Sequence, residues 1–211
     1  WLELYAGSNS EDLYGSILPE ETIEAMKEYR ISIKGPLTTP IGKGHKSINV
    51  RIRQKLDLFA CVRPIKYFPG TSTPMAESGL TDMVVFRENT EDLYSGIEWE
   101  PDSPGAKRII EFINKELGQS PFRFEKNCGI GIKPVSEEGT KRLIRMAIDY
   151  SLALNKSSIT VVHKGNIMKY TEGAFRDWAY DVVINEYSGI VQKDNTYIIE
   201  NSEFNSEIIV K

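Results

Sequence analysis

Residues 34–53 read KGPLTTPIGKGHKSINVRIR, and this segment predicts a strand, a loop and a helix in succession. The alternating run just before it, residues 31–33, stops at a Gly-Pro pair, which commonly ends a strand. After the loop, apolar residues recur at the spacing of one helix face, at Ile48, Ile52 and Leu56. Strands that alternate with helices along a chain are typical of an α/β fold.

The loop between the expected strand and helix suits a small anion. It combines glycines with hydroxyl, amide and cationic side chains, and glycine permits close backbone approaches. At the helix start, free backbone N–H groups and the helix dipole add to Ser47, Asn49 and Arg53 as donors for a carboxylate or phosphate. Taken alone, the segment is equally consistent with an ordinary helix cap.

The bulk composition describes a globular chain of one large or two small domains. Of its 211 residues, 40% are apolar and 27% are charged, which is typical of soluble proteins. The 26 basic and 30 acidic residues give a net charge of −4, which argues against nucleic-acid binding through a basic surface. The sequence has no run of about 18 apolar residues, so we expect no membrane span.

The cysteines and histidines give no metal-binding pattern. Cys61 and Cys128 lie far apart in apolar segments, which predicts reduced, buried thiols. His45 and His163 have no partners at ligand spacing, so we expect no zinc site. The run RENTED at 87–92 has enough carboxylates to hold a cation, but an acidic turn is the simpler interpretation.

Hydrophobic periodicity predicts further helices and strands along the chain. The helical patterns span residues 19–29, 46–56, 107–117, 137–154 and 171–187. Buried strands are expected at residues 57–67, from residue 81 onward and at 158–163, with short strands in the tail 190–211.

The pattern changes between about residues 96 and 131. Here one helix is flanked by short alternating segments at 97–99, 122–124 and 130–132. A piece this short cannot bury a core of its own, because autonomous folding is rare below about 40 residues. We therefore expect it to complete itself against another surface, such as a second subunit.

Several polar side chains lie near the ends of the apolar strand patterns. They are Lys34, Thr38, Arg63, Arg87, Tyr94, Lys164 and Asn166. In open α/β sheets, ligands bind beyond the carboxyl ends of the strands, so these side chains are expected to converge on one site. Together with Arg53, the arginines offer planar groups for bidentate carboxylate binding, and a small polyanion fits this set. Taken singly, each of these residues is more often a surface, ion-pair or packing residue.

Seven motifs resemble, in sequence and order, those of bacterial-type NADP-dependent isocitrate dehydrogenases in the isocitrate/isopropylmalate dehydrogenase family. They are KGPLTTP at 34–40, SINVRIR at 47–53, LFACVRP at 58–64, DMVVFRENTEDLYSGIE at 82–98, GIGIKP at 129–134, SEEGTKR at 136–142 and HKGNIMK at 163–169. The resemblance covers nearly the whole chain and fades beyond about Gly189.

The resemblance implies a role for each polar residue. The residues implied to hold the carboxylates of isocitrate are Ser47, Asn49, Arg53, Arg63 and Arg87. The Ser-x-Asn pair is implied to favour isocitrate over isopropylmalate. Thr38 and Asn166 are implied to lie near the nicotinamide of NADP. Tyr94 is the implied general acid, and Lys164 is implied to reach into the site of the partner subunit.

The implied reaction is oxidation of the isocitrate C2 hydroxyl by hydride transfer to NADP, followed by loss of CO2 and protonation of the enolate. The resemblance implies that Mg2+ or Mn2+ supplies Lewis acidity. A tyrosine suits the final step, because a phenol is protonated near neutral pH and a nearby ammonium eases loss of its proton.

The resemblance also implies a fold: an α/β, three-layer sheet-and-helix structure with a strand-rich clasp insertion, incomplete at both ends. The expected divisions are 1–58 as part of a large domain, 59–91 with 137–211 as a small domain, and 92–136 as the clasp of a homodimer. The metal-binding aspartates and the adenine contacts are expected beyond Lys211, and the first elements of the large domain before Trp1. We therefore expect no metal site in this chain and no turnover from these 211 residues alone. A cytoplasmic location is implied.

Two alternatives stay open. The first is a non-catalytic dimerisation and substrate-binding module, or a regulatory-type subunit, of the same family. The second concerns Ser47, which corresponds to a serine that a kinase/phosphatase modifies in some bacteria. A phosphate there adds about −1.5 to −2 charges where a substrate carboxylate would bind, so it would block binding. A plain substrate contact without regulation is equally consistent with the sequence.

Overall fold

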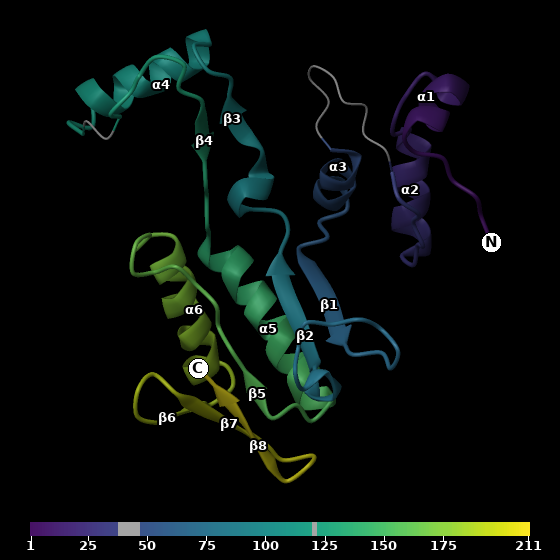
Figure 1. The fold of residues 1–211 in the computed structure, drawn as a ribbon, viewed down its shortest axis with the longest axis vertical. Coiled ribbons are helices and arrows are strands. Elements are labelled where there is room, and N and C mark those ends of the chain that lie inside the picture. The colour runs from purple at the N-terminus through teal and green to yellow at the C-terminus, as the bar shows by residue number, and fades with distance from the viewer. Residues whose placement is uncertain (38–46, 120–121) are drawn as a thin grey trace.

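The computed structural model describes residues 1–37, 47–119 and 122–211, and Figure 1 shows their arrangement. A central body combines two long helices, α5 (Glu137–Ala153) and α6 (Glu172–Asn185), with a four-stranded sheet. A two-stranded ribbon lies beside this body, three N-terminal helices lie beyond it, and a second ribbon with one helix extends from it (Figure 1). Helices and sheets together confirm the predicted α/β class.

The four-stranded sheet has the order β5-β8-β7-β6. Its strands are β5 (Ser158–Ile159), β6 (Ile190–Val191), β7 (Tyr197–Asn201) and β8 (Ser206–Val210). Neighbouring strands are antiparallel except β5 and β8, which are parallel. The short strands predicted in the tail are therefore confirmed.

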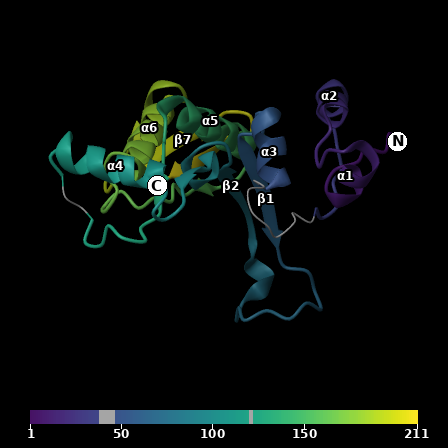
Figure 2. The ribbon, with the colours of Figure 1, turned by 90° about the horizontal axis from the view of Figure 1, so that it is seen from above.

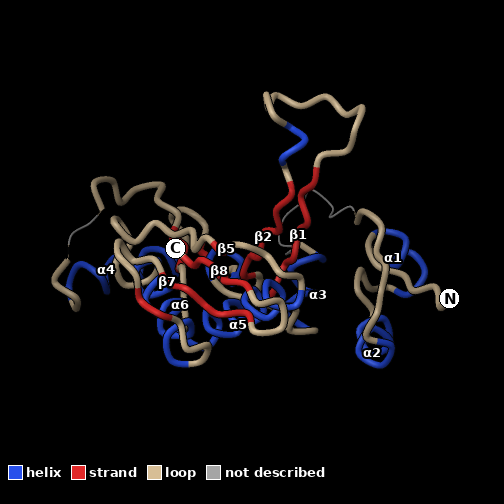
Figure 3. Tube along the Cα trace, turned by 90° about the horizontal axis from the view of Figure 1, so that it is seen from below, coloured by secondary structure: helices blue, strands red, loops and turns tan. Residues whose placement is uncertain are grey.

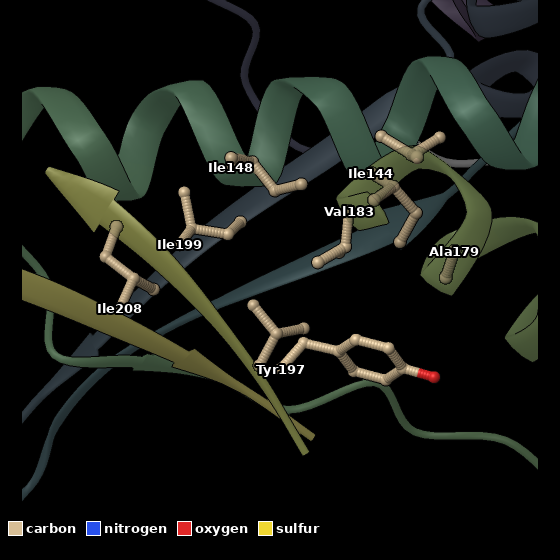
Figure 4. Packing of buried hydrophobic residues seen from close by; sticks show 9 residues of the cluster. Ile144, Ile148, Ala179, Val183, Tyr197, Ile199 and Ile208 are labelled. Carbon is tan, nitrogen blue, oxygen red and sulfur yellow. The ribbon is translucent and has the colours of Figure 1, made fainter. Parts of the chain in front are cut away.

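The main core lies between this sheet and the two long helices. Ile148 of α5, Val183 of α6 and Ile208 of β8 are fully buried members of one cluster (Figure 4). Alternate residues of β7 and β8 are buried, as expected when one face of a sheet is covered and the other is open. The core thus holds α5 and α6 against one face of the sheet.

Helix α5 shows why its prediction succeeded. The Ser136 hydroxyl caps it by accepting a hydrogen bond from the Gly139 N–H at 3.0 Å. The acidic side chains of its first turn, Glu137 and Glu138, are favourable beside the positive end of the helix dipole. These local signals agree with the apolar stripe that the helix buries.

The other predicted helices are also confirmed, within a few residues at their ends. They are α2 (Glu20–Tyr29), α3 (Ile48–Lys55), α4 (Pro104–Lys115) and α6 (Glu172–Asn185). A short helix that the sequence pattern did not predict, α1 (Ser8–Tyr14), buries only Ser10, so it has no apolar stripe to detect. None of the described helices is long and apolar enough to cross a bilayer.

The strand predicted at residues 31–33 is wrong. Ile31 and Ile33 are 88% and 81% exposed, and this segment pairs with no strand in the part of the chain that the structure describes. Nearby, Ile23 of α2 and Ile48 of α3 form a separate buried cluster with the segment before α2. Alternating apolar residues therefore do not make a strand where no neighbouring strand supplies hydrogen bonds.

The strands β1 (Ala60–Lys66) and β2 (Asp82–Glu88) form an antiparallel ribbon rather than two buried strands. Phe86 packs edge-on against Tyr150 of α5, with ring centroids 5.3 Å apart. The opposite face is open, and Met83 is 54% exposed there. The predicted burial is wrong because the helix covers only one face. The far end of the ribbon and the connection 67–81, which contains the 3-10 helix η1 (Ser78–Leu80), project away from the helices (Figures 2 and 3).

The strand predicted at 158–163 is shorter than expected, since only Ser158 and Ile159 form β5. A cavity of about 530 Å3 lies between β2 and the segment 156–162, with α5 along one wall. The segment is therefore paired on one side only, to β8. Missing backbone partners on the other side account for the shortened strand.

The short strands predicted at 97–99 and 130–132 are confirmed as β3 (Ile97–Trp99) and β4 (Ile130–Ile132), and the structure pairs them into a second ribbon. Gly105, at the start of α4, is required by the close approach of Trp99, since an added Cβ would lie 2.3 Å from its ring. The strand expected at 122–124 is wrong, because these residues form no strand and Phe124 is 72% exposed.

The two cysteines are free, as predicted, but they are half-buried rather than buried. Cys61 lies on the open face of the β1–β2 ribbon, and Cys128 precedes the short strand β4.

We predict that the alternation of β8 separates two neighbouring isoleucines in their effect on stability. Ile208 is fully buried and Ile209 is 43% exposed. Ile208→Ala should lower the free energy of unfolding by about 2–5 kcal/mol, the usual cost of this truncation in a core. Ile209→Ala should cost less than about 1 kcal/mol. Urea unfolding of both variants checks this, and equal midpoints would contradict the described packing.

Candidate active site

Arg63 and Arg87 lie on the same face of the β1–β2 ribbon. Arg87 is opposite Cys61 in the register, and Arg63 is opposite Val85. Opposed residues point to one face, and residues two apart along a strand share that face. The Arg63 Nε donates to the Cys61 Sγ at 3.2 Å, which directs this guanidinium along the strand. The register therefore brings together two of the predicted carboxylate-binding arginines.

Arg87 also contacts the predicted acid, Tyr94. Tyr94 lies in the 3-10 helix η2 (Asp92–Ser95), just beyond β2. The Arg87 guanidinium stacks on the Tyr94 ring, with Cζ 4.2 Å from the ring centroid, and its Nη2 donates to the Tyr94 hydroxyl. The hydroxyl oxygen accepts this bond, so the O–H remains free to donate elsewhere. A cation in this position stabilises the phenolate that forms when the proton leaves.

The turn between Arg87 and Tyr94 is held by its own carboxylates. Glu88 accepts hydrogen bonds from the N–H groups of Thr90 and Glu91, the latter at 2.7 Å. Glu91 in turn accepts from the Ser136 N–H at 2.8 Å and from its hydroxyl at 2.5 Å, at the start of α5. The structure thus supports an acidic turn, in which these carboxylates hold the backbone of the turn and of the α5 start by accepting hydrogen bonds from N–H groups.

A cavity of about 190 Å3 opens beside this turn. Its walls include Arg87, Asp92 and Tyr94, together with apolar side chains from β2 and α5 and Glu172 from the start of α6. Among the predicted site residues that the structure describes, only Arg87 and Tyr94 line it. The cavity therefore places a cation and a phenol side by side on a partly apolar wall.

Asn49 and Arg53 lie in a different cavity, of about 500 Å3, together with Lys34. Both residues are on α3, and Ser47 precedes this helix without using its hydroxyl as a cap. The Gln54 side chain of α3 donates to the Tyr94 carbonyl at 3.2 Å, which ties this helix to the turn of Tyr94. Thr38 lies outside the described residues.

Lys164 and Asn166 lie in an exposed loop before α6, and neither lines the two cavities described above. The Lys164 N–H donates to Glu172 Oε2 at 2.9 Å. Gly165 packs directly against Gly173. A Cβ added to Gly165 would lie 2.9 Å from the Gly173 Cα. The loop is therefore fixed to the start of α6, and within one chain the structure does not bring Lys164 to Tyr94.

Glu172 also forms an ion pair with Lys133, which follows β4. The Lys133 hydrogen bond lowers the pKa of the Glu172 carboxyl, outweighing burial, and the Lys164 N–H adds to this effect. Burial opposes the charge of Lys133, but its bonds to Glu172 and Asp92 prevail and raise the lysine pKa. The stabilisation from Glu172 is thus present above the ordinary carboxyl pKa and is lost as the pH falls through the lowered value.

The family model described as isocitrate/isopropylmalate dehydrogenase matches residues 1–202 of the chain. The chain belongs to this family. A Pseudomonas aeruginosa relative named isocitrate dehydrogenase (NADP) is 48% identical over 100% of this chain and 51% of its own length. A Colwellia maris relative named isocitrate dehydrogenase (NADP) 1 is 51% identical over 100% of this chain and 52% of its own length. The chain spans about half the length of the curated relatives it matches.

Solved structures of the family agree with the fold. The crystal structure of isocitrate dehydrogenase from Methylococcus capsulatus aligns with a TM-score of 0.68 at 36% identity, over 87% of this chain and 47% of that chain. Family membership confirms the resemblance recognised in the seven motifs.

Sequence reasoning did not select Asp92 and Glu172, which line the cavity of Tyr94, or Lys133, which forms ion pairs with both. Lys133 and Asp92 occur in motifs of the family resemblance, but their ion-pair partners are distant in sequence. No local pattern marks Lys133, because its role depends on partners that only the fold brings near.

The carboxylates of the described chain do not assemble into a metal site. In residues 1–37, 47–119 and 122–211, no three side chains of His, Cys, Asp or Glu form a group that could hold a metal ion. The divalent metal that the family resemblance implies therefore does not fit any set of residues described here.

We predict that Glu91→Ala loosens the turn that carries Tyr94. The substitution leaves the Ser136 N–H and the start of α5 without their acceptor, which should lower the free energy of unfolding by about 1–2 kcal/mol. Glu98→Ala, on an exposed position of β3, is the matched control and should cost less than about 0.5 kcal/mol. Urea unfolding measures both, and an unchanged Glu91→Ala midpoint would contradict the prediction.

Proposed function

We propose that the protein carrying this chain is an NADP-dependent isocitrate dehydrogenase, which converts isocitrate to 2-oxoglutarate and CO2. The observation that carries the proposal is the contact of Arg87 with Tyr94, on the same ribbon face as Arg63. In support of the proposal, a phenol that can donate a proton contacts a guanidinium, a group suited to binding carboxylates. The names of relatives about 50% identical to the chain support the same activity.

Substrate recognition rests on matching the three negative charges of isocitrate. Arg63 and Arg87 form one arm on the ribbon, and Arg53 with Asn49 forms another on α3. The ion-paired arginines of the described chain are Arg142, Arg145 and Arg176. The arginines of the two arms are not among them, so their charges are available to an anion. Ser47 extends the α3 arm toward the substrate.

Tyr94 is the proposed general acid of the last step. Isocitrate loses a hydride from C2 and a proton from its hydroxyl, and the C–C bond to the β-carboxylate then breaks to release CO2. The electron pair left behind forms an enolate, whose carbon takes the Tyr94 proton. Proton loss from the hydroxyl and proton gain at carbon cancel, so the products are 2-oxoglutarate, CO2 and NADPH. The Arg87 guanidinium stabilises the phenolate formed at Tyr94.

NADP supplies the hydride acceptor when bound. Thr38 and Asn166 are the residues of this chain proposed to lie near its nicotinamide, as the family resemblance implies. The proposal includes Mg2+ or Mn2+ for the same reason.

We further propose that residues 92–136 are a clasp that joins two copies of the chain. In support, apolar side chains of this segment remain exposed, among them Phe112 at 52% and Phe124 at 72%. The clasp would bring Lys164 of each subunit into the site of the other. In this arrangement 1–58 is part of a large domain, and 59–91 with 137–211 forms a small domain, within a three-layer fold. A cytoplasmic location follows from the same resemblance.

The test of this proposal is an assay of the full-length protein. NADPH formation should require isocitrate and Mg2+ or Mn2+, with NADP preferred over NAD and little activity on isopropylmalate. Preference for isopropylmalate would overturn the assignment. Isocitrate binding without turnover would instead favour a non-catalytic, regulatory-type subunit.

We predict that Tyr94→Phe lowers kcat by about a hundredfold or more, the usual loss of a general acid. Phenylalanine keeps the ring on which Arg87 stacks and removes only the hydroxyl. Tyr150→Phe is the control, because Tyr150 packs on Phe86, has no role in the proposed site and should leave kcat within about twofold. Comparable kcat values for the two variants would rule out the acid role of Tyr94.

We predict that Ser47→Asp weakens isocitrate binding, raising KM by about tenfold or more through repulsion of a substrate carboxylate. Ser47→Ala should have a much smaller effect, because it removes a hydroxyl without adding charge. Initial rates over a range of isocitrate concentrations measure both. An unchanged KM for Ser47→Asp would remove Ser47 from the site and would also remove the basis for regulation by a kinase/phosphatase.

A further inference from the structure

Three charged side chains connect the turn of Tyr94 with the loop of Lys164. Lys133 Nζ lies 3.1 Å from Asp92 Oδ1, and it also forms an ion pair with Glu172 Oε1. The second oxygen of Glu172 accepts the Lys164 N–H at 2.9 Å. One ammonium group therefore bridges a carboxylate on the Tyr94 turn and a carboxylate that holds the Lys164 loop.

The three groups come from elements that are distant in sequence. Asp92 begins η2, Lys133 follows β4, and Glu172 is the first residue of α6. The Lys133 and Glu172 side chains are both only 19% exposed, so solvent screens their interaction less than it would screen a surface pair. Glu172 and Asp92 also line the cavity that contains Arg87 and Tyr94.

The backbone at both ends of this bridge is fixed by further bonds. The Asp92 N–H donates to the Pro134 carbonyl at 2.9 Å, one residue beyond Lys133. At the other end, the N–H groups of Ile167 and Met168 donate to the Lys164 carbonyl and close the loop into a turn. A change in the position of Lys133 would therefore shift the backbone of both the Tyr94 turn and the Lys164 loop.

We propose that Lys133 and Glu172 are positioning residues, which set the Tyr94 turn and the Lys164 loop relative to each other. This inference rests on the proposed function, in which Tyr94 is the acid of one site and Lys164 serves the site of the partner subunit. Lys133 then connects the two sites of the dimer within each chain. Misplacing a catalytic group by about 1 Å can cost a hundredfold in rate, so loss of the bridge should reduce kcat more than substrate binding.

The chain contains a matched control for this bridge. Lys141 of α5 also joins two carboxylates, with its Nζ 2.7 Å from Glu137 and in an ion pair with Asp181 of α6. Its side chain is 17% exposed, close to the 19% of Lys133. Lys141 contacts neither the Tyr94 turn nor the Lys164 loop through its ion pairs, so Lys141→Met reports the general effect of removing a bridging lysine.

The experiment compares Lys133→Met, Lys141→Met and the unaltered sequence in the full-length protein. We expect Lys133→Met to lower kcat by about tenfold or more with KM changed by less than about threefold, and Lys141→Met to change kcat by less than about twofold. Lys133→Arg, which keeps the charge, should recover most of the lost kcat. Glu172→Gln, which changes almost no volume, should reproduce the loss.

Hydrogen exchange of the segment 163–168 provides a readout that does not depend on activity. Exchange should be faster in Lys133→Met and in Glu172→Gln than in the unaltered protein, and it should be unchanged in Lys141→Met. Equal exchange in all four proteins, or equal kcat losses for Lys133→Met and Lys141→Met, would overturn the inference. If the unaltered protein fails to oxidise isocitrate, the proposed function fails, while hydrogen exchange still decides whether Lys133 orders the loop.

Discussion

The hydrogen bonds from Ser136 to the Glu91 carboxylate join the turn of the proposed acid to the core of the molecule. Glu91 lies in the turn that carries Tyr94, and Ser136 caps the helix that packs against α6 and the sheet. Ser136 is held in place by the packing of α5 in the core, so its hydrogen bonds to Glu91 anchor the Tyr94 turn to that core. Gly139 makes the contact sterically feasible, since an added Cβ would lie 2.8 Å from the Glu91 oxygen.

Helices were predicted well because their signals are local. Ser136, the acids after it and the stripe that includes Ile148 all occur within one segment, so sequence spacing alone reveals α5. Strand burial was predicted poorly because it depends on what covers the strand. Met83 and Ile31 have the residue types of buried strands, yet the ribbon has one open face and the segment 31–33 has no partner in the described chain. Hydrophobic periodicity shows which face of a helix or strand is apolar, but it does not show which other element covers that face.

The site was predicted in parts. The sequence indicated that Arg63 and Arg87 end apolar segments, but their shared face depends on the antiparallel register, which no local pattern specifies. The contact of Arg87 with Tyr94 was within reach of sequence reasoning, because a tight turn separates them. Lys133 was not, since its partners Asp92 and Glu172 lie on other elements and any surface lysine has the same local appearance.

The charge balance of the bridge argues for a role in geometry rather than in stability. Lys133 is one cation between two carboxylates, and burying such groups costs desolvation energy that ion pairing only partly recovers. An apolar contact of similar volume is often as stabilising. What an apolar contact lacks is direction: Glu172 uses one oxygen for Lys133 and the other for the Lys164 N–H, which fixes the loop at a defined point on α6. This directed contact therefore agrees with the proposed role of Lys133 and Glu172 in setting the Tyr94 turn relative to the Lys164 loop.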